Sequence, residues 1–361
     1  MNESALRRTH LFGDLRPFAQ CHAPTLVARP DGRIRVAFFA GTFESHADVG
    51  IWSTTGSIGA DDASRFEPPR RIARVGDAPH WNPVLFALDD TGDRLVLHFK
   101  VGASIRRWQT FQQSSEDGGA SWSEARPLVP GDRGGRGAVR TKPMRLASGD
   151  WLAGASLEAP RRWTSFFDRS PDGIGGWQAT PAVPMDARAG KGLIQPALWA
   201  SRPGRVHALF RSAVGRIFRS DSEDDGRSWS CAAPTDLPNN NSGLDVVRLG
   251  DGRLVLACNP VGRNRGARTP LSLLVSRDEG ATWPGRIDLE TGPGEFSYPA
   301  IVPFRDGVAV AWTWNRRRIA VAQVPAEALS CAEPPAPRDD DPGPGDPPGR
   351  STPGECEGAP A

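Results

Sequence analysis

The chain has 361 residues, which is enough for two or three average domains or for one large all-β domain, and its formal net charge at pH 7 is only +2. Its positive charges are almost all arginines scattered along the sequence without a basic run, which argues against nucleic acid as a partner. No apolar run is long enough for a membrane span or for the core of a signal peptide, so the sequence predicts a cytoplasmic protein.

The five cysteines stand at irregular spacings, at positions 21, 231, 258, 331 and 356. They have neither the density of a disulfide scaffold nor the close pairing of a zinc site. We therefore expect a reducing compartment. No Cys/His cluster offers a metal site, and we expect neither a metal nor another cofactor.

Six segments share one pattern, in which a short apolar run, a Gly/Asp/Pro turn and a second apolar or alternating run follow one another as in a β-hairpin. They begin at His22, Trp81, Thr141, Ile194, Ser242 and Ser297. A proline stands at the same place in five of them, namely at Pro24, Pro83, Pro143, Pro196 and Pro299, and Leu244 fills the remaining slot. The resulting period of 48 to 60 residues indicates a repeat architecture.

A second signature, Ser-x-Asp-x-Gly-x-Ser/Thr-Trp, recurs in register with the hairpins and is called an Asp box below. Clean copies run over residues 115–122, 222–229 and 276–283, and a degenerate copy runs over residues 170–177. The Asp can accept backbone N–H bonds in a tight turn, Gly takes the positive φ, and Trp packs the turn against a neighbouring strand. Because the boxes repeat, we assign them a structural role and expect Trp122, Trp229 and Trp283 to be largely buried.

Two hairpins per period make a four-stranded sheet, and six such sheets predict a six-bladed β-propeller over residues 1–325. A seven-bladed ring with one degenerate blade is the alternative. The segment around Arg8 is predicted to add an outer strand to the last blade and so close the ring. Residues 326–361, which are rich in Pro, Gly and Asp, are predicted to be a disordered tail.

Singular polar residues are predicted to gather at one mouth of the propeller, opposite the Asp boxes, where a concave site is expected. The inner strands would begin there with His22, Asn82, Lys142, Gln195 and Tyr298, and the second strands would end there with Glu158, Arg211, Asn259 and Asn315. A loop that carries Glu44, His46 and Asp48 would emerge on the same face. Tyr298 is the only tyrosine of the chain, which raises the prospect that its hydroxyl has a function.

These motifs resemble those of the sialidase superfamily, the neuraminidase-like proteins with Asp-box (BNR) repeats, over roughly residues 10–324. The resemblance implies an exo-glycosidase that removes a terminal acidic sugar, such as sialic acid, from a glycan. It implies Tyr298 as nucleophile, Asp48 as acid/base, and Arg211 and Arg268 as a clamp on the sugar carboxylate. His22, Gln195, Lys142, Asn82 and Glu44 would complete the substrate site.

Two positions differ from the family pattern. His22 stands where the first of three arginines is expected, and Gln195 stands where a glutamate should polarise the tyrosine. Since an amide cannot take a phenolic proton, Glu295, Glu158 or Glu44 would have to serve instead, with Glu295 the first choice. A polysaccharide lyase that uses Tyr298 or His22 as base, and a non-catalytic glycan-binding propeller, are the alternative functions.

Overall fold

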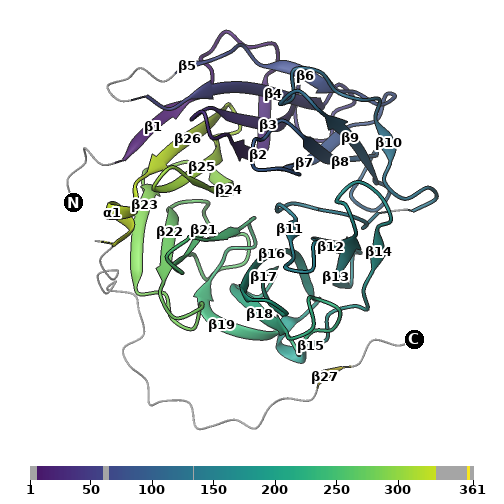
Figure 1. Cartoon of the computed structure of the whole chain (residues 1–361), viewed down its shortest axis with the longest axis vertical. Coiled ribbons are helices and arrows are strands. Elements are labelled where there is room, and N and C mark those ends of the chain that lie inside the picture. Colours follow the sequence, from purple (N-terminus) through teal and green to yellow (C-terminus); the bar gives the residue numbers. More distant parts are fainter. Residues whose placement is uncertain (1–5, 60–64, 133, 331–355, 358–361) are drawn as a thin grey trace.

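Antiparallel strands form nearly all the regular structure of the computed structural model, which describes residues 6–59, 65–132, 134–330 and 356–357. Six sheets stand around a common axis, as Figure 1 shows. The six-bladed ring is therefore confirmed, and the alternative of seven blades is wrong.

Each blade runs outward from the axis in chain order. The first blade contains β2 (Gln20–Ala28), β3 (Ile34–Gly41), β4 (Gly50–Ser57), β5 (Arg65–Phe66) and β6 (Arg70–Ala73), and the second contains β7 (His80–Ala87), β8 (Leu95–Val101), β9 (Gln109–Ser115) and β10 (Arg126–Pro127). The third blade contains β11 (Met144–Arg145), β12 (Trp151–Glu158), β13 (Trp163–Ser170) and β14 (Gln178–Ala179), and the fourth contains β16 (Leu193–Arg202), β17 (Arg205–Ser212), β18 (Arg216–Ser222) and β19 (Ala233–Pro238). The fifth blade contains β20 (Asp245–Arg248), β21 (Leu254–Cys258), β22 (Leu271–Ser276) and β23 (Gly285–Glu290), and the last contains β24 (Phe296–Phe304), β25 (Gly307–Trp314) and β26 (Arg318–Val324).

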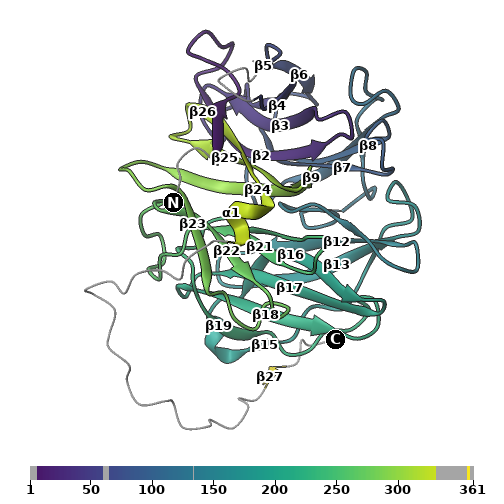
Figure 2. The ribbon, with the colours of Figure 1, turned by 60° about the vertical axis from the view of Figure 1, so that its left-hand side comes forward.

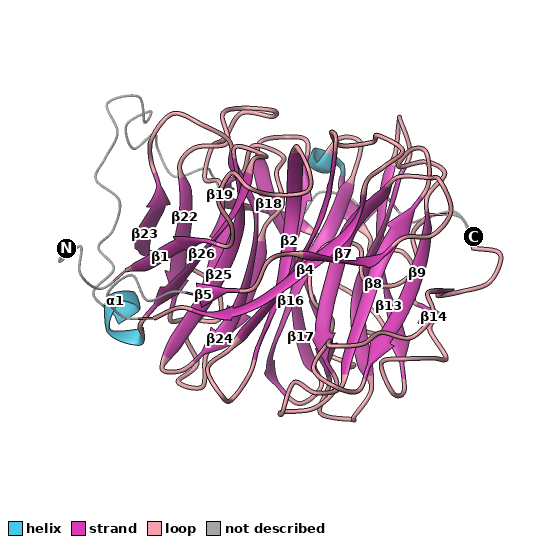
Figure 3. Cartoon of the chain, turned by 90° about the horizontal axis from the view of Figure 1, so that it is seen from above, coloured by secondary structure: helices cyan, strands magenta, loops and turns pink. Residues whose placement is uncertain are grey.

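The N-terminal strand β1 (Arg7–His10) completes the last blade by pairing antiparallel with β26, so the chain closes its ring as the sequence predicted. Seen from the side in Figure 3, the sheets stand upright and loops cover both ends of the ring. The hydrophobic core lies between neighbouring sheets. Trp312 and Phe38 are fully buried there, in the blades on either side of the closure.

The Asp boxes lie at the end of the ring opposite the ends of the second strands. In the fourth blade the amide of Asp225 donates to the carbonyl of Gly204 in the turn between β16 and β17, whereas Arg211 stands near the other end of β17. Trp229 is 9% exposed and stacks on Phe167 of the preceding blade, with ring centroids 4.1 Å apart. Trp122 and Trp283 are only partly buried, so the expectation that all three indoles are largely buried holds for Trp229 alone.

The ordered body of the propeller continues past the predicted boundary at residue 325. Helix α1 (Ala326–Ser330) packs Leu329 into the core at 1% exposure, and Arg253 binds the Ala326 carbonyl and the Ser330 hydroxyl. The boundary predicted at residue 325 therefore comes too early, because residues 326–330 form this helix, which Figure 2 shows beside the last two blades. Most of the predicted tail lies outside the described residues.

Two short strands lie apart from the blades, β15 (Met185–Asp186) and β27 (Cys356–Glu357), and they pair with each other. The 3₁₀ helix η2 (Ala187–Ala189) follows β15. Cys21 and Cys258 are buried free thiols, whereas Cys231 is disulfide-bonded. The sequence predicts a reducing compartment and does not predict this disulfide, since disulfides are more common in oxidising compartments. Among the described residues no helix has the length and hydropathy needed to cross a bilayer.

Candidate active site

In four blades, a β-bulge near the start of the inner strand positions the residue that precedes the repeated proline. The pairing of β24 with β25 shifts register between Ser297 and Ala300, and Tyr298 inside this bulge has a φ of 54°. Ala23, Asn82 and Gln195 occupy the same place before a proline, with φ of 52°, 41° and 54°. Proline disfavours the right-handed helical region for the residue before it, and the left-handed region costs a non-glycine residue about 1–3 kcal/mol. The repeated prolines thus mark a repeated, strained bend.

Arg140 stabilises the bends of the first and last blades through hydrogen bonds to their backbone. Its guanidinium, which is 1% exposed, donates to the carbonyl oxygens of Pro24, Tyr298 and Pro299 at 3.1, 2.5 and 2.9 Å. Burial lowers the pKa of Arg140 to about 10, so the group remains charged at neutral pH. One side chain of the third blade therefore holds the first and last blades together directly beneath Tyr298.

The hydroxyl of Tyr298 contacts a guanidinium rather than a carboxylate. Arg211 donates to the Tyr298 oxygen at 2.9 Å, to Oε1 of Gln195 at 3.1 Å and to Oδ1 of Asn241 at 2.6 Å. The guanidinium carbons of Arg211 and Arg268 lie 5.7 and 5.4 Å from the centre of the tyrosine ring. Arg211, Arg268 and Tyr298 come from three different blades. Their close contacts confirm the prediction that they lie on the same face of the propeller.

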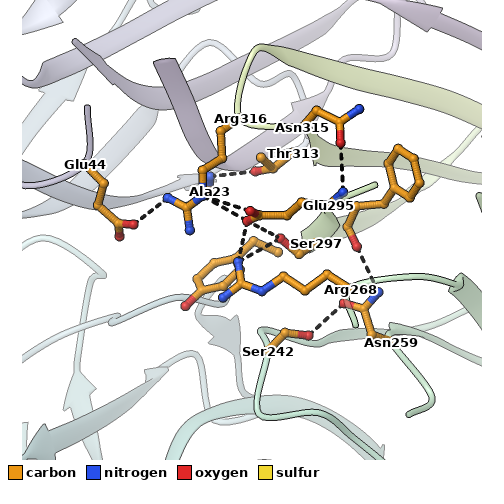
Figure 4. Close-up of polar contacts among 12 residues, drawn as sticks. Ala23, Glu44, Ser242, Asn259, Arg268, Glu295, Ser297, Thr313, Asn315 and Arg316 are labelled. Carbon is orange, nitrogen blue, oxygen red and sulfur yellow. Dashed lines mark hydrogen bonds and ion pairs between the residues drawn. The ribbon is translucent and has the colours of Figure 1, made fainter. Parts of the chain in front are cut away.

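Arg268 and Arg316 are held in place by two carboxylates (Figure 4). Glu295 accepts from Arg268 at 2.6 Å and from Nε of Arg316 at 3.0 and 3.1 Å, and Arg316 also donates to Glu44. The prediction that Glu295 is the hydrogen-bond partner of Tyr298 is therefore not supported. Glu295 instead positions two guanidinium groups.

Arg316 is the residue that the sequence analysis missed. It lies in the turn between β25 and β26 with a φ of 53°, and its carbonyl accepts from the amide of Cys21 at 2.8 Å. Its backbone thus runs beside His22, where the resemblance placed an arginine. Its position in the sequence could have identified it, because Arg316 directly follows Asn315, which the sequence analysis places at the end of a second strand on the face of the site.

Arg211, Arg268, Arg316 and Glu295 border an open pocket of about 540 Å³, within the range of small-molecule sites. Its charged lining residues are Lys191, Arg211, Arg265, Arg268, Arg316 and Glu295. The pocket is therefore strongly cationic.

The comparisons with known proteins agree with this geometry. The profile of the family described as "BNR repeat-like domain" matches residues 32–310. The chain belongs to this family. No curated protein matches the sequence.

Several solved structures share the fold of this BNR repeat-like propeller at low identity. A Dyadobacter fermentans protein of unknown function is 17% identical with a TM-score of 0.71, over 89% of this chain and 99% of that one. The NanB sialidase of Streptococcus pneumoniae is 12% identical with a TM-score of 0.70, over 90% and 71%. The intramolecular trans-sialidase of Ruminococcus gnavus, in complex with oseltamivir carboxylate, is 11% identical with a TM-score of 0.68, over 89% and 98%. The resemblance to sialidases is thus confirmed for the fold.

His22 of the BNR propeller does not replace the expected arginine. It is 2% exposed and its ring packs 4.3 Å from that of Tyr298. Burial, followed by the charges of Arg316 and Arg268, holds the pKa of His22 well below 6.5. A neutral, covered imidazole cannot bind a carboxylate as a cation, so His22 does not supply the charge of the expected arginine, and its predicted substrate contact stays a prediction.

Asp48 is poorly suited to donate a proton. Burial alone would raise its pKa, but hydrogen bonds from Thr42 and His46 outweigh this and lower the pKa of Asp48 to about 2. Since a general acid works best with a pKa near the operating pH, the geometry disfavours the predicted role.

Lys142 and Asn82 do not line the pocket. Lys142 donates to both oxygens of Asp245 at 2.9 and 3.0 Å and to the carbonyl of Val246, which ties the third blade to the fifth. Asn82 is 6% exposed. Lys142 is therefore a bridge between blades, and neither residue is placed to touch a ligand in this pocket.

Gln195 connects Arg211 to Glu158, a partly buried acid. Its Nε2 donates to Glu158 at 3.2 Å while its Oε1 accepts from Arg211. Burial raises the pKa of Glu158, although the charge of Arg211 opposes the shift. Gln195 thus orients Arg211 without contacting Tyr298 in any hydrogen bond among the described residues. In that part of the chain no group of three or more His, Cys, Asp or Glu could hold a metal ion.

Proposed function

We propose that this protein is an exo-glycosidase that binds a terminal sugar bearing a carboxylate, such as sialic acid, and cleaves its glycosidic bond with Tyr298 as nucleophile. The observation that carries the proposal is the 2.9 Å contact between the Tyr298 oxygen and Arg211, which lines the pocket together with Arg268 and Arg316. A nucleophile and a carboxylate clamp lie within reach of one sugar ring. The neighbours of the same fold whose names are printed as sialidases support this substrate class.

The clamp is organised before the ligand arrives. Arg268 and Arg316 are fixed by Glu295 and Glu44, and Arg211 is fixed by Gln195 and Asn241. Three guanidiniums and two carboxylates leave one positive charge, which matches one sugar carboxylate. Fixed, planar donors lose little freedom on binding and suit bidentate contacts with a carboxylate.

In the proposed first step the Tyr298 hydroxyl gives up its proton to solvent, its oxygen bonds to the anomeric carbon, and the bond to the leaving oxygen breaks with its electron pair. The guanidinium of Arg211 already donates to the attacking oxygen and would stabilise negative charge on it. Water then displaces the tyrosine and releases the free sugar. Because Asp48 is held ionised, we expect aryl glycosides, whose phenolate leaves without prior protonation, to react much faster than alkyl glycosides.

A non-catalytic acidic-glycan binder is the second candidate. It is favoured by one observation: among the described residues no carboxylate has a hydrogen bond to the Tyr298 hydroxyl. The cationic pocket alone is sufficient for such a role.

One incubation separates these functions. The protein is mixed with 4-methylumbelliferyl and methyl α-sialosides and with a uronate-containing glycan, and products are followed by fluorescence, mass and ultraviolet absorbance, with Tyr298→Phe as control. Release of free sugar by the parent but not by the variant supports the glycosidase. An unsaturated sugar would instead identify a lyase, and tight binding of intact sialoside by both proteins would identify a binder.

A further inference from the structure

The pocket contains two cations that the proposed carboxylate clamp does not use. Lys191 and Arg265 both line it, and neither forms an ion pair with a carboxylate among the residues that the structure describes. The clamp itself balances one carboxylate on the ligand. Lys191 and Arg265 therefore leave about two further positive charges facing the same space.

Backbone contacts fix the positions from which both side chains extend. Lys191 lies with its ammonium 3.6 Å from the centre of the Trp163 ring, and its carbonyl accepts from the Trp163 amide at 2.5 Å. Gly192 that follows has a φ of 120°, and a β-carbon there would collide with the Trp163 carbonyl. Only glycine permits this close approach of the two segments.

Asn240 holds the loop that carries Arg265. Its carbonyl accepts from the Arg265 amide at 3.0 Å, and its Nδ2 donates to the carbonyl of Ala267 at 2.6 Å. Arg265 is kept in the left-handed region, with a φ of 56°. Asn240 is 2% exposed, and its Oδ1 has no hydrogen-bond partner among the described residues although the side chain lines the pocket. An unpaired buried acceptor beside two unpaired cations points to a ligand with hydroxyl and anionic groups.

Burial, followed by the charge of Arg265, lowers the pKa of Lys191, and Glu158 is the carboxylate that opposes this shift. It is already bound to Gln195 and its pKa is raised by burial, so it offsets Lys191 only in part. Among the described residues, Glu295 is the only acidic side chain that lines the pocket, and it is already paired with Arg268 and Arg316.

We propose that Lys191 and Arg265 form a second anionic subsite, so that the preferred substrate is a dianionic glycan whose second oxyanion lies on the unit next to the terminal acidic sugar. This inference rests on the proposed function, because it takes the terminal carboxylate to occupy the arginine clamp. Both a sulfate ester and a second sugar carboxylate have the required chemistry.

Calorimetric titration of the Tyr298→Phe protein tests the subsite without the need for turnover. The probes are 3′-sialyllactose, its 6-O-sulfated form and an α2,8-linked disialyllactose. We expect at least one dianionic probe to bind roughly five to ten times more tightly than 3′-sialyllactose, as expected for two partly exposed ion pairs. Preference for the sulfated probe alone assigns a sulfate ester, and preference for the disialyl probe alone assigns a second carboxylate.

Adding Lys191→Gln and Arg265→Gln should abolish the preference while changing the affinity for 3′-sialyllactose by less than about twofold. Arg263→Gln is the matched control, because this exposed arginine lies in the same loop but does not line the pocket. It should keep the preference. Equal affinities for all three probes in the parent overturn the subsite and leave the proposed function standing. Failure of 3′-sialyllactose to bind overturns the proposed function, and the subsite with it.

Discussion

Tyr298 owes its position to its backbone more than to its hydroxyl. Arg140 fixes its carbonyl, the bulge fixes its φ, and the ring packs against His22. None of these contacts involves the phenol oxygen, whose one recorded partner among the described residues is Arg211. Removal of that oxygen should therefore separate chemistry from folding.

We expect Tyr298→Phe to lower turnover of an aryl sialoside by at least about 10³-fold, because it removes the nucleophile. The melting temperature should fall by no more than a few degrees, since one hydrogen bond of about 1 kcal/mol is lost. Steady-state kinetics and calorimetry measure the two quantities. Turnover by the variant at the parental rate would exclude the nucleophile role.

Arg316→Lys should raise KM roughly tenfold or more with a smaller change in kcat. The ammonium keeps the charge but cannot bind Glu295, Glu44 and a carboxylate in one plane. Arg317→Lys, at the exposed residue that follows, provides the control and should behave as the parent. An unchanged KM in Arg316→Lys would show that the third guanidinium does not contact substrate.

At the scale of elements, an Asp box joins the end of one strand to the adjacent turn and blade. Asp224 accepts hydrogen bonds from the Ser222 hydroxyl, the Ser228 amide and the Ser228 hydroxyl. Its carboxylate is therefore fully engaged in hydrogen bonds within the turn. The structural role assigned to the boxes agrees with these contacts. We expect the burial of the tryptophan that ends the box to determine how much the contact between neighbouring blades contributes to the free energy of unfolding.

Trp229→Ala should reduce the free energy of unfolding by about 3–5 kcal/mol, because a buried indole stacked on Phe167 is lost. Trp283→Ala, in a box whose indole is only partly buried, should cost distinctly less. Urea denaturation of the two variants gives the comparison. Equal losses would mean that burial of the indole is not what the box contributes.

The prolines, turns and boxes were sufficient to predict six blades and the face of the site, because each is a local pattern with a period. The identity of the third guanidinium was not predictable in the same way. Arg316 reaches the clamp because Asn315 and Arg316 both adopt positive φ, at 51° and 53°, in a turn that no sequence rule required. The burial of His22 and the pairing of Glu295 likewise depend on side chains from other blades.

At the scale of the whole molecule, buried histidines make stability sensitive to mild acid. Burial is the main cause that lowers the pKa of His80 to about 4 and that of His98 to about 3, and it holds the pKa of His22 well below 6.5. As pH falls through 6.5, the unfolded chain takes up protons at these sites and the folded chain does not. The free energy of unfolding must therefore fall with pH in this window.

Each such histidine should cost about 2 kcal/mol at pH 5 relative to pH 8, since one pH unit below the unfolded pKa corresponds to ~1.4 kcal/mol. Melting temperatures between pH 8 and pH 5 measure the slope. His98→Gln should make the slope shallower, because one buried histidine that stays neutral in the folded chain is removed. A slope in His98→Gln as steep as in the parent would contradict this account.

The pairing of β1 with β26 also sets an order of events during synthesis. Arg7 to His10 leave the ribosome before the six blades, yet their partners, Ala320 to Gln323, are made more than three hundred residues later. Until then the last blade is incomplete, and Glu44 of the first blade cannot meet Arg316 of the last. The proposed clamp therefore cannot form until Arg316 has been made and the first and last blades meet.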